Sequence, residues 1–140
     1  MKTKLIFTIN GIIHIIMGSF LWIGANIIGK PFTNNSFQLK APGENLTDGI
    51  HMVIASTVDT VGAFNIGIGL MLLIIRNINN LESAKKLLMG HFSLIISVLI
   101  LSQSYNHFFL GGGAPLPVLI LLIISLNLSL FGLKLSLIHI

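Results

Sequence analysis

Hydrophobic residues run in four long stretches along the chain, and short polar segments separate them. A helix needs about 20 apolar residues to cross the hydrocarbon core of a bilayer. Stretches of that length lie at about residues 5–29, 51–75, 87–110 and 116–137. The pattern therefore predicts an all-α integral membrane protein, a four-helix bundle with short connections that forms a single domain over residues 1–140.

The connections between these stretches are marked by turn-forming and charged residues. The longest, residues 30–49, contains two prolines and several asparagines, so we expect an irregular outer loop whose Phe32 and Phe37 fold back onto the bundle. The first stretch is too long for the apolar part of a signal peptide, and no A-x-A cleavage site follows it. We therefore expect it to be retained as a membrane span.

The basic residues predict how the chain is threaded through the membrane, because short cytoplasmic segments carry an excess of Lys and Arg. Lys30 and Lys40 lie in the long loop. Six basic residues lie on the opposite side, namely Lys2, Lys4, Arg76, Lys85, Lys86 and Lys134. This asymmetry predicts that both termini are cytoplasmic and that loop 30–49 is outside.

Composition narrows the class of protein further. Hydrophobic residues make up 54% of the chain and charged residues 9%, whereas charged residues are about 25% of a soluble domain. Twelve charged side chains could not keep so apolar a chain in water, so a soluble domain, a disordered tail and a nucleic-acid binder are excluded. The absence of cysteine excludes disulfides, thiolate chemistry and cysteine-ligated metal centres.

Polar residues inside the spans are candidates for function, because they are costly in hydrocarbon. Asp59 is the only acidic residue within a predicted span. Counted from the span centres at about 1.5 Å per residue, Asp59 and Gln103 both lie roughly 6 Å towards the outside. Trp22 lies at nearly the same level, and His51 and His107 lie further out. These candidate ligand-binding or proton-handling residues predict a polar funnel in the outer half. In the alternative interpretation, Asp59 only fixes helix packing by bonding Gln103 or a threonine.

His14 is a sixth candidate. It shares a helix face with Asn10 and with glycines at positions 11 and 18, so it should point into the bundle. It could handle protons, or a hydrogen bond to Asn65 or Asn127 could satisfy it without any function. Ser125 and Ser129 also line up on one face of the fourth span, and Gly62 and Ile66 lie on a stripe of the second span that is rich in small residues.

No cofactor or metal site is expected from the histidines. A haem held by two histidines needs them at matched depth, and the predicted spans separate His14 from His91 by roughly 7–8 Å in depth. That placement makes His91 interfacial. His51 and His107 differ by about four residues, and neither belongs to an H-x-x-H or H-x-x-x-H motif. No serine lies in a nucleophile-elbow motif, so no catalytic residue is assigned.

The second span contains a polar residue followed by glycine and an aromatic, and then G-x-G-L-x-L-L, over residues 59–73. In this pattern and in overall layout the chain resembles the DoxX-like family of small four-helix membrane proteins. The resemblance implies a four-helix fold and an accessory role, linked in some members to quinone-dependent oxidoreductases. The family pattern places an arginine near the start of this helix where this chain has Asp59, so no site residue is transferred.

Two classes of function follow from these observations. The first is a non-catalytic accessory or assembly subunit that contacts the lipid bilayer and other membrane subunits, or a second copy of itself. Small size and the lack of a catalytic motif favour it. The alternative is a protein that binds a hydrophobic small molecule, a lipid or a quinone, in the outward-facing polar funnel.

Overall fold

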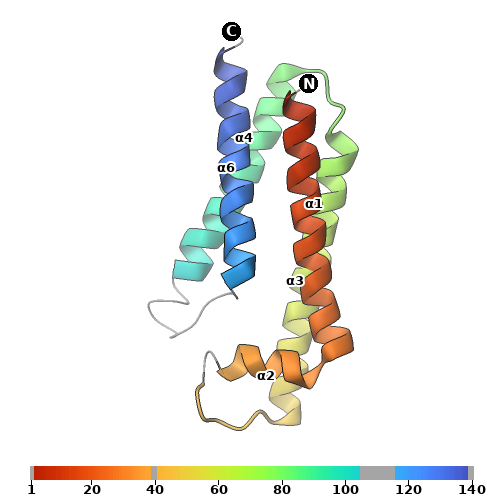
Figure 1. The fold of residues 1–140 in the computed structure, drawn as a ribbon, viewed down its shortest axis with the longest axis vertical. Coiled ribbons are helices and arrows are strands. Elements are labelled where there is room, and N and C mark those ends of the chain that lie inside the picture. Colours follow the sequence, from red (N-terminus) through yellow and green to blue (C-terminus); the bar gives the residue numbers. More distant parts are fainter. Residues whose placement is uncertain (1, 39–40, 105–115, 139–140) are drawn as a thin grey trace.

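The computed structural model describes residues 2–38, 41–104 and 116–138, and the secondary structure in these segments is helical (Figure 1). The elements in chain order are α1 (Lys2–Ile23), the π-helical turn η1 (Gly24–Ile28), α2 (Lys30–Gln38), α3 (Asp48–Ile75), α4 (Leu81–Ser97), the π-helical segment η2 (Val98–Ser104) and α6 (Leu116–Ile138).

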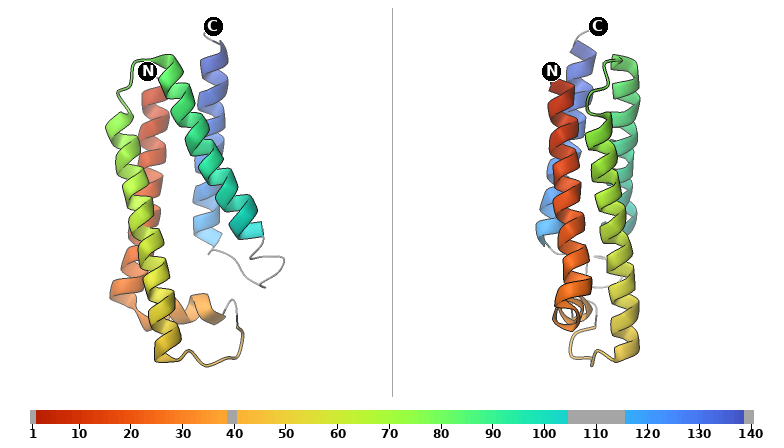
Figure 2. Two further views of the ribbon diagram at one scale, coloured as in Figure 1. Left: turned by 180° about the vertical axis from the view of Figure 1, so that it is seen from behind. Right: turned by 90° about the vertical axis from the view of Figure 1, so that its right-hand side faces the viewer.

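The prediction of four long apolar helices is confirmed. Within the described residues, four segments are long and apolar enough to cross a membrane: Thr3–Ile28, Asp48–Ile75, Leu81–Leu101 and Leu116–Lys134. The two termini lie at one end of the bundle, together with the connection between α3 and α4, and α2 lies across the opposite end (Figures 1 and 2). We call these the termini end and the α2 end.

The helices form two pairs. α1 packs along α3, α4 packs against α6, and a contact between α1 and α6 joins the pairs. α3 and α4 make hardly any contact, although they are consecutive in the chain. They diverge from their connection towards the α2 end, as the left view of Figure 2 shows.

Glycines bring α1 and α3 unusually close. A Cβ atom added to Gly18 would lie 2.5 Å from the carbonyl oxygen of Gly62, and one added to Gly69 would lie 2.6 Å from that of Gly11. The two glycines on each helix are seven residues apart, which is the repeat that keeps one face of a helix on a partner. Small residues at such positions allow backbones to approach in lipid. The small-residue faces predicted for the first two spans therefore meet each other.

The connection between α1 and α3 differs from the expected irregular loop, because its first part is the nine-residue helix α2. Gly29 has φ of 67°, which turns the chain between η1 and α2. Phe32 then packs on Gly24, where an added Cβ would lie 2.5 Å from its ring, and stacks edge-on with Phe20 at a centroid distance of 5.7 Å. The prediction that Phe32 folds back onto the bundle is confirmed.

The third long helix begins earlier than predicted. The Asn80 side chain caps it by accepting a hydrogen bond from the Ser83 backbone at 3.0 Å, so α4 starts at Leu81 rather than near residue 87. Lys86 belongs to this helix and pairs with Glu82 at 2.8 Å instead of lying in the connection. Residues 105–110 of the predicted span lie outside the described residues. The shift moves His91 from the predicted interface towards the middle of the apolar segment.

Two hydrophobic clusters fill the bundle, and a polar layer separates them. The first cluster lies towards the termini end and contains Ile6, Phe7, Leu72, Ala84 and Leu88. The second lies towards the α2 end and contains Met17, Ile95, Val118 and Leu122. Between them along α1, α4 and α6 lie buried Asn10, His14, His91, Ser125 and Ser129.

Candidate functional site

The centre of the polar layer is a direct contact between two histidines from different helices. His14 Nε2 of α1 lies 2.9 Å from His91 Nε2 of α4, and the two rings meet edge-on at 77°. Both side chains are at most 5% exposed. The predicted difference of 7–8 Å in depth between them was wrong, because it placed the third span several residues too far along the chain.

From His91 of α4, the network continues through serine and asparagine side chains of α1 and α6. His91 Nδ1 lies 2.8 Å from Ser129 Oγ, and Asn10 Nδ2 donates to that same oxygen at 3.1 Å. Ser125 Oγ donates to Asn10 Oδ1 at 3.0 Å. Spacings of four residues, 10 to 14 and 125 to 129, put each pair on one helix face. The layer therefore ties α1, α4 and α6 together by hydrogen bonds between buried side chains.

On its other side the network reaches α3 through Asn65. His14 Nδ1 lies 2.9 Å from Asn65 Oδ1, and Asn65 Nδ2 donates to the Val61 carbonyl oxygen at 2.9 Å. The prediction that Asn65 could satisfy His14 is confirmed. Asn127, the other candidate, is exposed and donates to the Ile123 carbonyl oxygen. The amide of Asn65 has two N–H groups, and the described residues supply a hydrogen-bond acceptor for only one of them.

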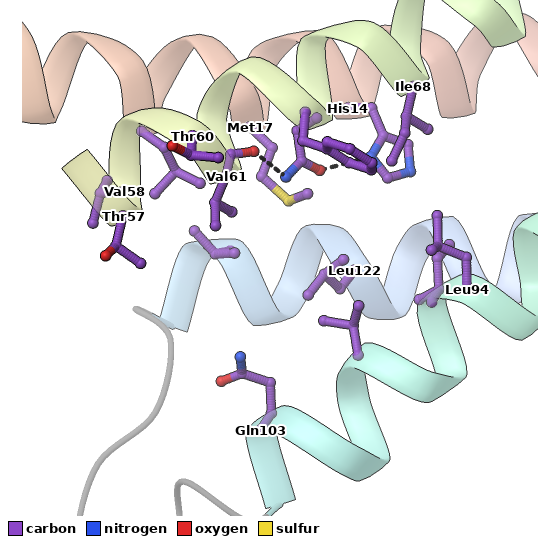
Figure 3. Close-up of a pocket in the computed structure, with 16 residues that line it drawn as sticks. His14, Met17, Thr57, Val58, Thr60, Val61, Ile68, Leu94, Gln103 and Leu122 are labelled. Atoms are coloured by element: carbon purple, nitrogen blue, oxygen red, sulfur yellow. Dashed lines mark hydrogen bonds between the residues drawn. The ribbon is translucent and has the colours of Figure 1, made fainter. Parts of the chain in front are cut away.

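A cavity of about 520 Å³ lies beside this network, towards the α2 end. Its lining comes from α1, α3, α4, η2 and α6 and is mostly aliphatic and aromatic. The polar lining residues are His14, Asn65, Thr57, Thr60 and Gln103. In Figure 3, His14 and Thr60 lie on the α1–α3 side, opposite Leu94, Leu122 and Gln103. The cavity thus occupies the space left where α3 and α4 diverge.

The six candidate residues, those of the predicted polar funnel and His14, are distributed over several places. Gln103 and His14 line the cavity. Asp59 does not; its Oδ1 accepts a hydrogen bond from Asn26 Nδ2 of η1 at 2.7 Å. The expected partner, Gln103 or a threonine, was therefore wrong, and the contact instead joins α3 to the end of the first span.

The other three predicted residues lie apart from the cavity or outside the described residues. His51 Nδ1 lies 2.7 Å from Thr33 Oγ1 and links α3 to α2. Trp22 is 43% exposed, and its carbonyl oxygen accepts a hydrogen bond from Asn26. His107 lies outside the described residues. His51 and Trp22 therefore belong to the α2 end of the bundle and do not join the cavity.

The network contains residues that the candidate list omitted, namely Asn10, Asn65, His91, Ser125 and Ser129. Helical spacing alone had aligned Asn10 with His14 and Ser125 with Ser129. The missing signal was the Asn80 cap, which would have placed the start of α4 correctly and brought His91 to the depth of His14. Among the described residues there is no group of three or more His, Cys, Asp or Glu side chains that could hold a metal ion.

A comparison of the chain with models of known protein families, with curated protein sequences and with solved structures finds no match.

Proposed function

We propose that this chain is a membrane protein that binds an amphipathic small molecule, such as a lipid or a quinone, in the cavity between α3 and α4. The observation that carries the proposal is an aliphatic cavity of about 520 Å³ whose inner end carries Asn65 and His14. Ligand sites are commonly about 300–1,000 Å³, mostly apolar, with a few polar groups that orient the ligand.

The polar end of the ligand has a specific partner in this proposal. The Asn65 N–H that does not reach Val61 can donate to an oxygen of the ligand. The apolar part then lies against Met17, Leu94 and Leu122. Burial of an alkyl group stabilises the complex by about 0.8 kcal/mol per CH₂, relative to water. A head group that accepts a hydrogen bond, attached to a chain or ring that fills the cavity, fits this arrangement.

The route into the cavity supports a ligand that dissolves in the bilayer. Because α3 and α4 diverge, the cavity lies between two apolar helices, and among the described residues no polar loop lines it. In the orientation favoured by the basic residues, with both termini cytoplasmic, the cavity belongs to the outer half of the membrane. A ligand would then reach it sideways from the outer leaflet.

Native mass spectrometry of the protein, extracted gently from its own membrane, tests this function. We expect a retained small mass in the wild type, and its loss in Asn65→Ala and in Val61→Phe, which narrows the cavity. Asn127→Ala is the matched control, because Asn127 also donates to the carbonyl four residues earlier but lies outside the cavity lining. A wild type that carries no small mass, or equal retention by all variants, would contradict the proposal.

A non-catalytic accessory subunit is the second candidate function, and one surface favours it. Ala63 and Gly67 are exposed on α3, four residues apart, and nothing lies within 4 Å of a Cβ built at Gly67. Small residues at this spacing allow another helix to approach in lipid. In the same mass spectra, heavier co-migrating chains that Gly67→Leu removes would support this role. A redox-linked role, and an absence of haem and metal, stay predictions from the sequence.

A further inference from the structure

The hydrogen-bond chain through the polar layer has a direction that can be assigned from its ends. The Val61 carbonyl oxygen accepts from Asn65 Nδ2, which turns the amide oxygen of Asn65 towards His14. An amide oxygen only accepts hydrogen bonds. His14 Nδ1 therefore carries a proton and donates it to Asn65, whatever the state of the rest of the chain.

In the neutral form of the pair, the proton on His14 Nδ1 determines which atom donates in each of the other hydrogen bonds. A neutral imidazole has a single N–H, so His14 Nε2 must accept, and His91 Nε2 is the donor across the 2.9 Å contact. His91 Nδ1 then has no proton and accepts from the Ser129 hydroxyl at 2.8 Å. In this form each ring carries one N–H group, and all four ring nitrogens take part in hydrogen bonds.

A second arrangement of the same atoms contains one more proton. Ser129 Oγ also lies 3.1 Å from the Ser125 carbonyl oxygen. When the Ser129 hydroxyl donates there, its oxygen is free to accept from a proton on His91 Nδ1. The pair then holds three N–H groups, and their acceptors are Asn65 Oδ1, the facing Nε2 atom and Ser129 Oγ. Rotation of one hydroxyl group is the only rearrangement required.

A further proton does not fit. It would put an N–H on both Nε2 atoms, which face each other at 2.9 Å with no acceptor between them. We propose that the His14–His91 pair is a proton-binding site that takes up one proton per chain and shares it between the two rings, with the Ser129 hydroxyl turning from His91 to the Ser125 carbonyl. The site does not depend on a ligand in the cavity.

The charged side chains of the surrounding helices lie at a distance from the pair. On α3, Asp59 is six residues from Asn65, about 9 Å along the axis, and bonds Asn26 instead. On α6, Lys134 is five residues from Ser129, about 7.5 Å along the axis. The other charged residues described on the packed helices lie near the helix ends, namely Lys2 and Lys4 on α1, Asp48 on α3, Arg76 after α3, and Glu82, Lys85 and Lys86 on α4. Hydrogen bonds rather than a counter-ion therefore hold the added charge.

The position of the pair connects this site to the cavity. His14 lines the inner end of the cavity. Uptake of the proton therefore places a positive charge next to the cavity wall and leaves the helices in place. The proton adds to a histidine nitrogen lone pair, so no oxidant or other reactant is needed.

Nitrogen NMR of the full chain in lipid nanodiscs, with ¹⁵N-labelled histidine, tests the proposal, because the ring shifts distinguish N–H from bare nitrogen. Signals of the pair are identified by their loss in His14→Gln and His91→Gln. Between about pH 4 and pH 9 we expect one transition, in which the pair gains one proton. No transition, a gain of two protons, or independent titration of the two rings would overturn the proposal.

Two serine variants separate the proposed role of Ser129 from a purely structural one. Ser129→Ala removes the acceptor of the added proton, and we expect at least about a tenfold weaker proton affinity, a shift of one pH unit. Ser125→Ala is the matched control, since both serines are fully buried on α6, but among the described residues the Ser125 hydroxyl bonds only Asn10. Ser129→Thr keeps the hydroxyl and should restore the wild-type transition. Equal shifts in Ser129→Ala and Ser125→Ala would overturn the proposal.

Discussion

Replacement of Gly18 by alanine tests how closely α1 and α3 must pack. The added Cβ would lie 2.5 Å from the Gly62 carbonyl oxygen and 2.8 Å from the Ile66 backbone nitrogen. Ordinary van der Waals contact begins at 3.4 Å, so the Gly62 oxygen must move away by about 0.9 Å, the difference between 3.4 and 2.5. Because these two atoms belong to the backbone, rotation of the Ile66 side chain, whose Cγ1 would also lie 2.8 Å away, cannot relieve the clash, and the helices must separate.

The loss of unfolding free energy in Gly18→Ala is best measured against a control substitution on the same helix pair. Gly67→Ala also gains helix propensity, about 1 kcal/mol, but its Cβ meets nothing within 4 Å. That gain is common to both variants and cancels in their comparison. Inserting a methyl group into a closely packed interface costs about 1–3 kcal/mol. We therefore expect Gly18→Ala to have a free energy of unfolding about 1–3 kcal/mol below that of Gly67→Ala.

Reversible unfolding in mild detergent, driven by added denaturing detergent and followed by helical circular dichroism, measures this difference. Gly69→Ala should behave like Gly18→Ala, because its Cβ would lie 2.6 Å from the Gly11 carbonyl oxygen. If Gly18→Ala and Gly67→Ala unfold at the same detergent fraction, α1 and α3 do not pack as closely at Gly18 as the structure shows.

Three further predictions concern the α2 end. Asp59→Asn should keep the fold and any small mass bound in the cavity, because an amide oxygen still accepts from Asn26 and Asp59 does not line the cavity; loss of that mass in native mass spectra would show that Asp59 acts on the ligand. Phe32→Ala should raise hydrogen–deuterium exchange in residues 30–38, since its ring anchors α2, while α4 stays protected; unchanged exchange in α2 would contradict this anchoring. Lys30→Ala should leave the free energy of unfolding nearly unchanged, because the Lys30–Asp48 ion pair is exposed and screened by solvent; a clear loss in the same unfolding assay would show that the pair is more than a surface contact.

The depth of a residue within a helix can be predicted only as well as the helix ends. The first, second and fourth segments begin within three residues of their predicted starts. The third was placed by its apolar run and by the two adjacent lysines, whereas Asn80 starts the helix ahead of those lysines. Long basic side chains can extend from a helix to the interface, so they do not mark its end. That single difference hid the contact between His14 and His91.

The sequence by itself determined the features that depend on local spacing and composition. Four apolar stretches specify four long helices, and residues three, four or seven apart show which side chains share a face. This was sufficient to align Gly11 with Gly18 and Ser125 with Ser129. It was also sufficient to direct His14 into the bundle and to identify helices that are long and apolar enough to cross a membrane.

Only the tertiary structure decided which of these helix faces contact each other and where neighbouring helices diverge. The contact of His14 with His91 and the bond from Asp59 to Asn26 join residues 77 and 33 positions apart, and the cavity between α3 and α4 is lined by residues that are distant in the sequence. Periodicity fixes the angle of a side chain around its own helix axis, but not the rotation or sliding of one helix against another. Those are set by the fit of whole surfaces, here by the backbone contacts at the glycines of α1 and α3.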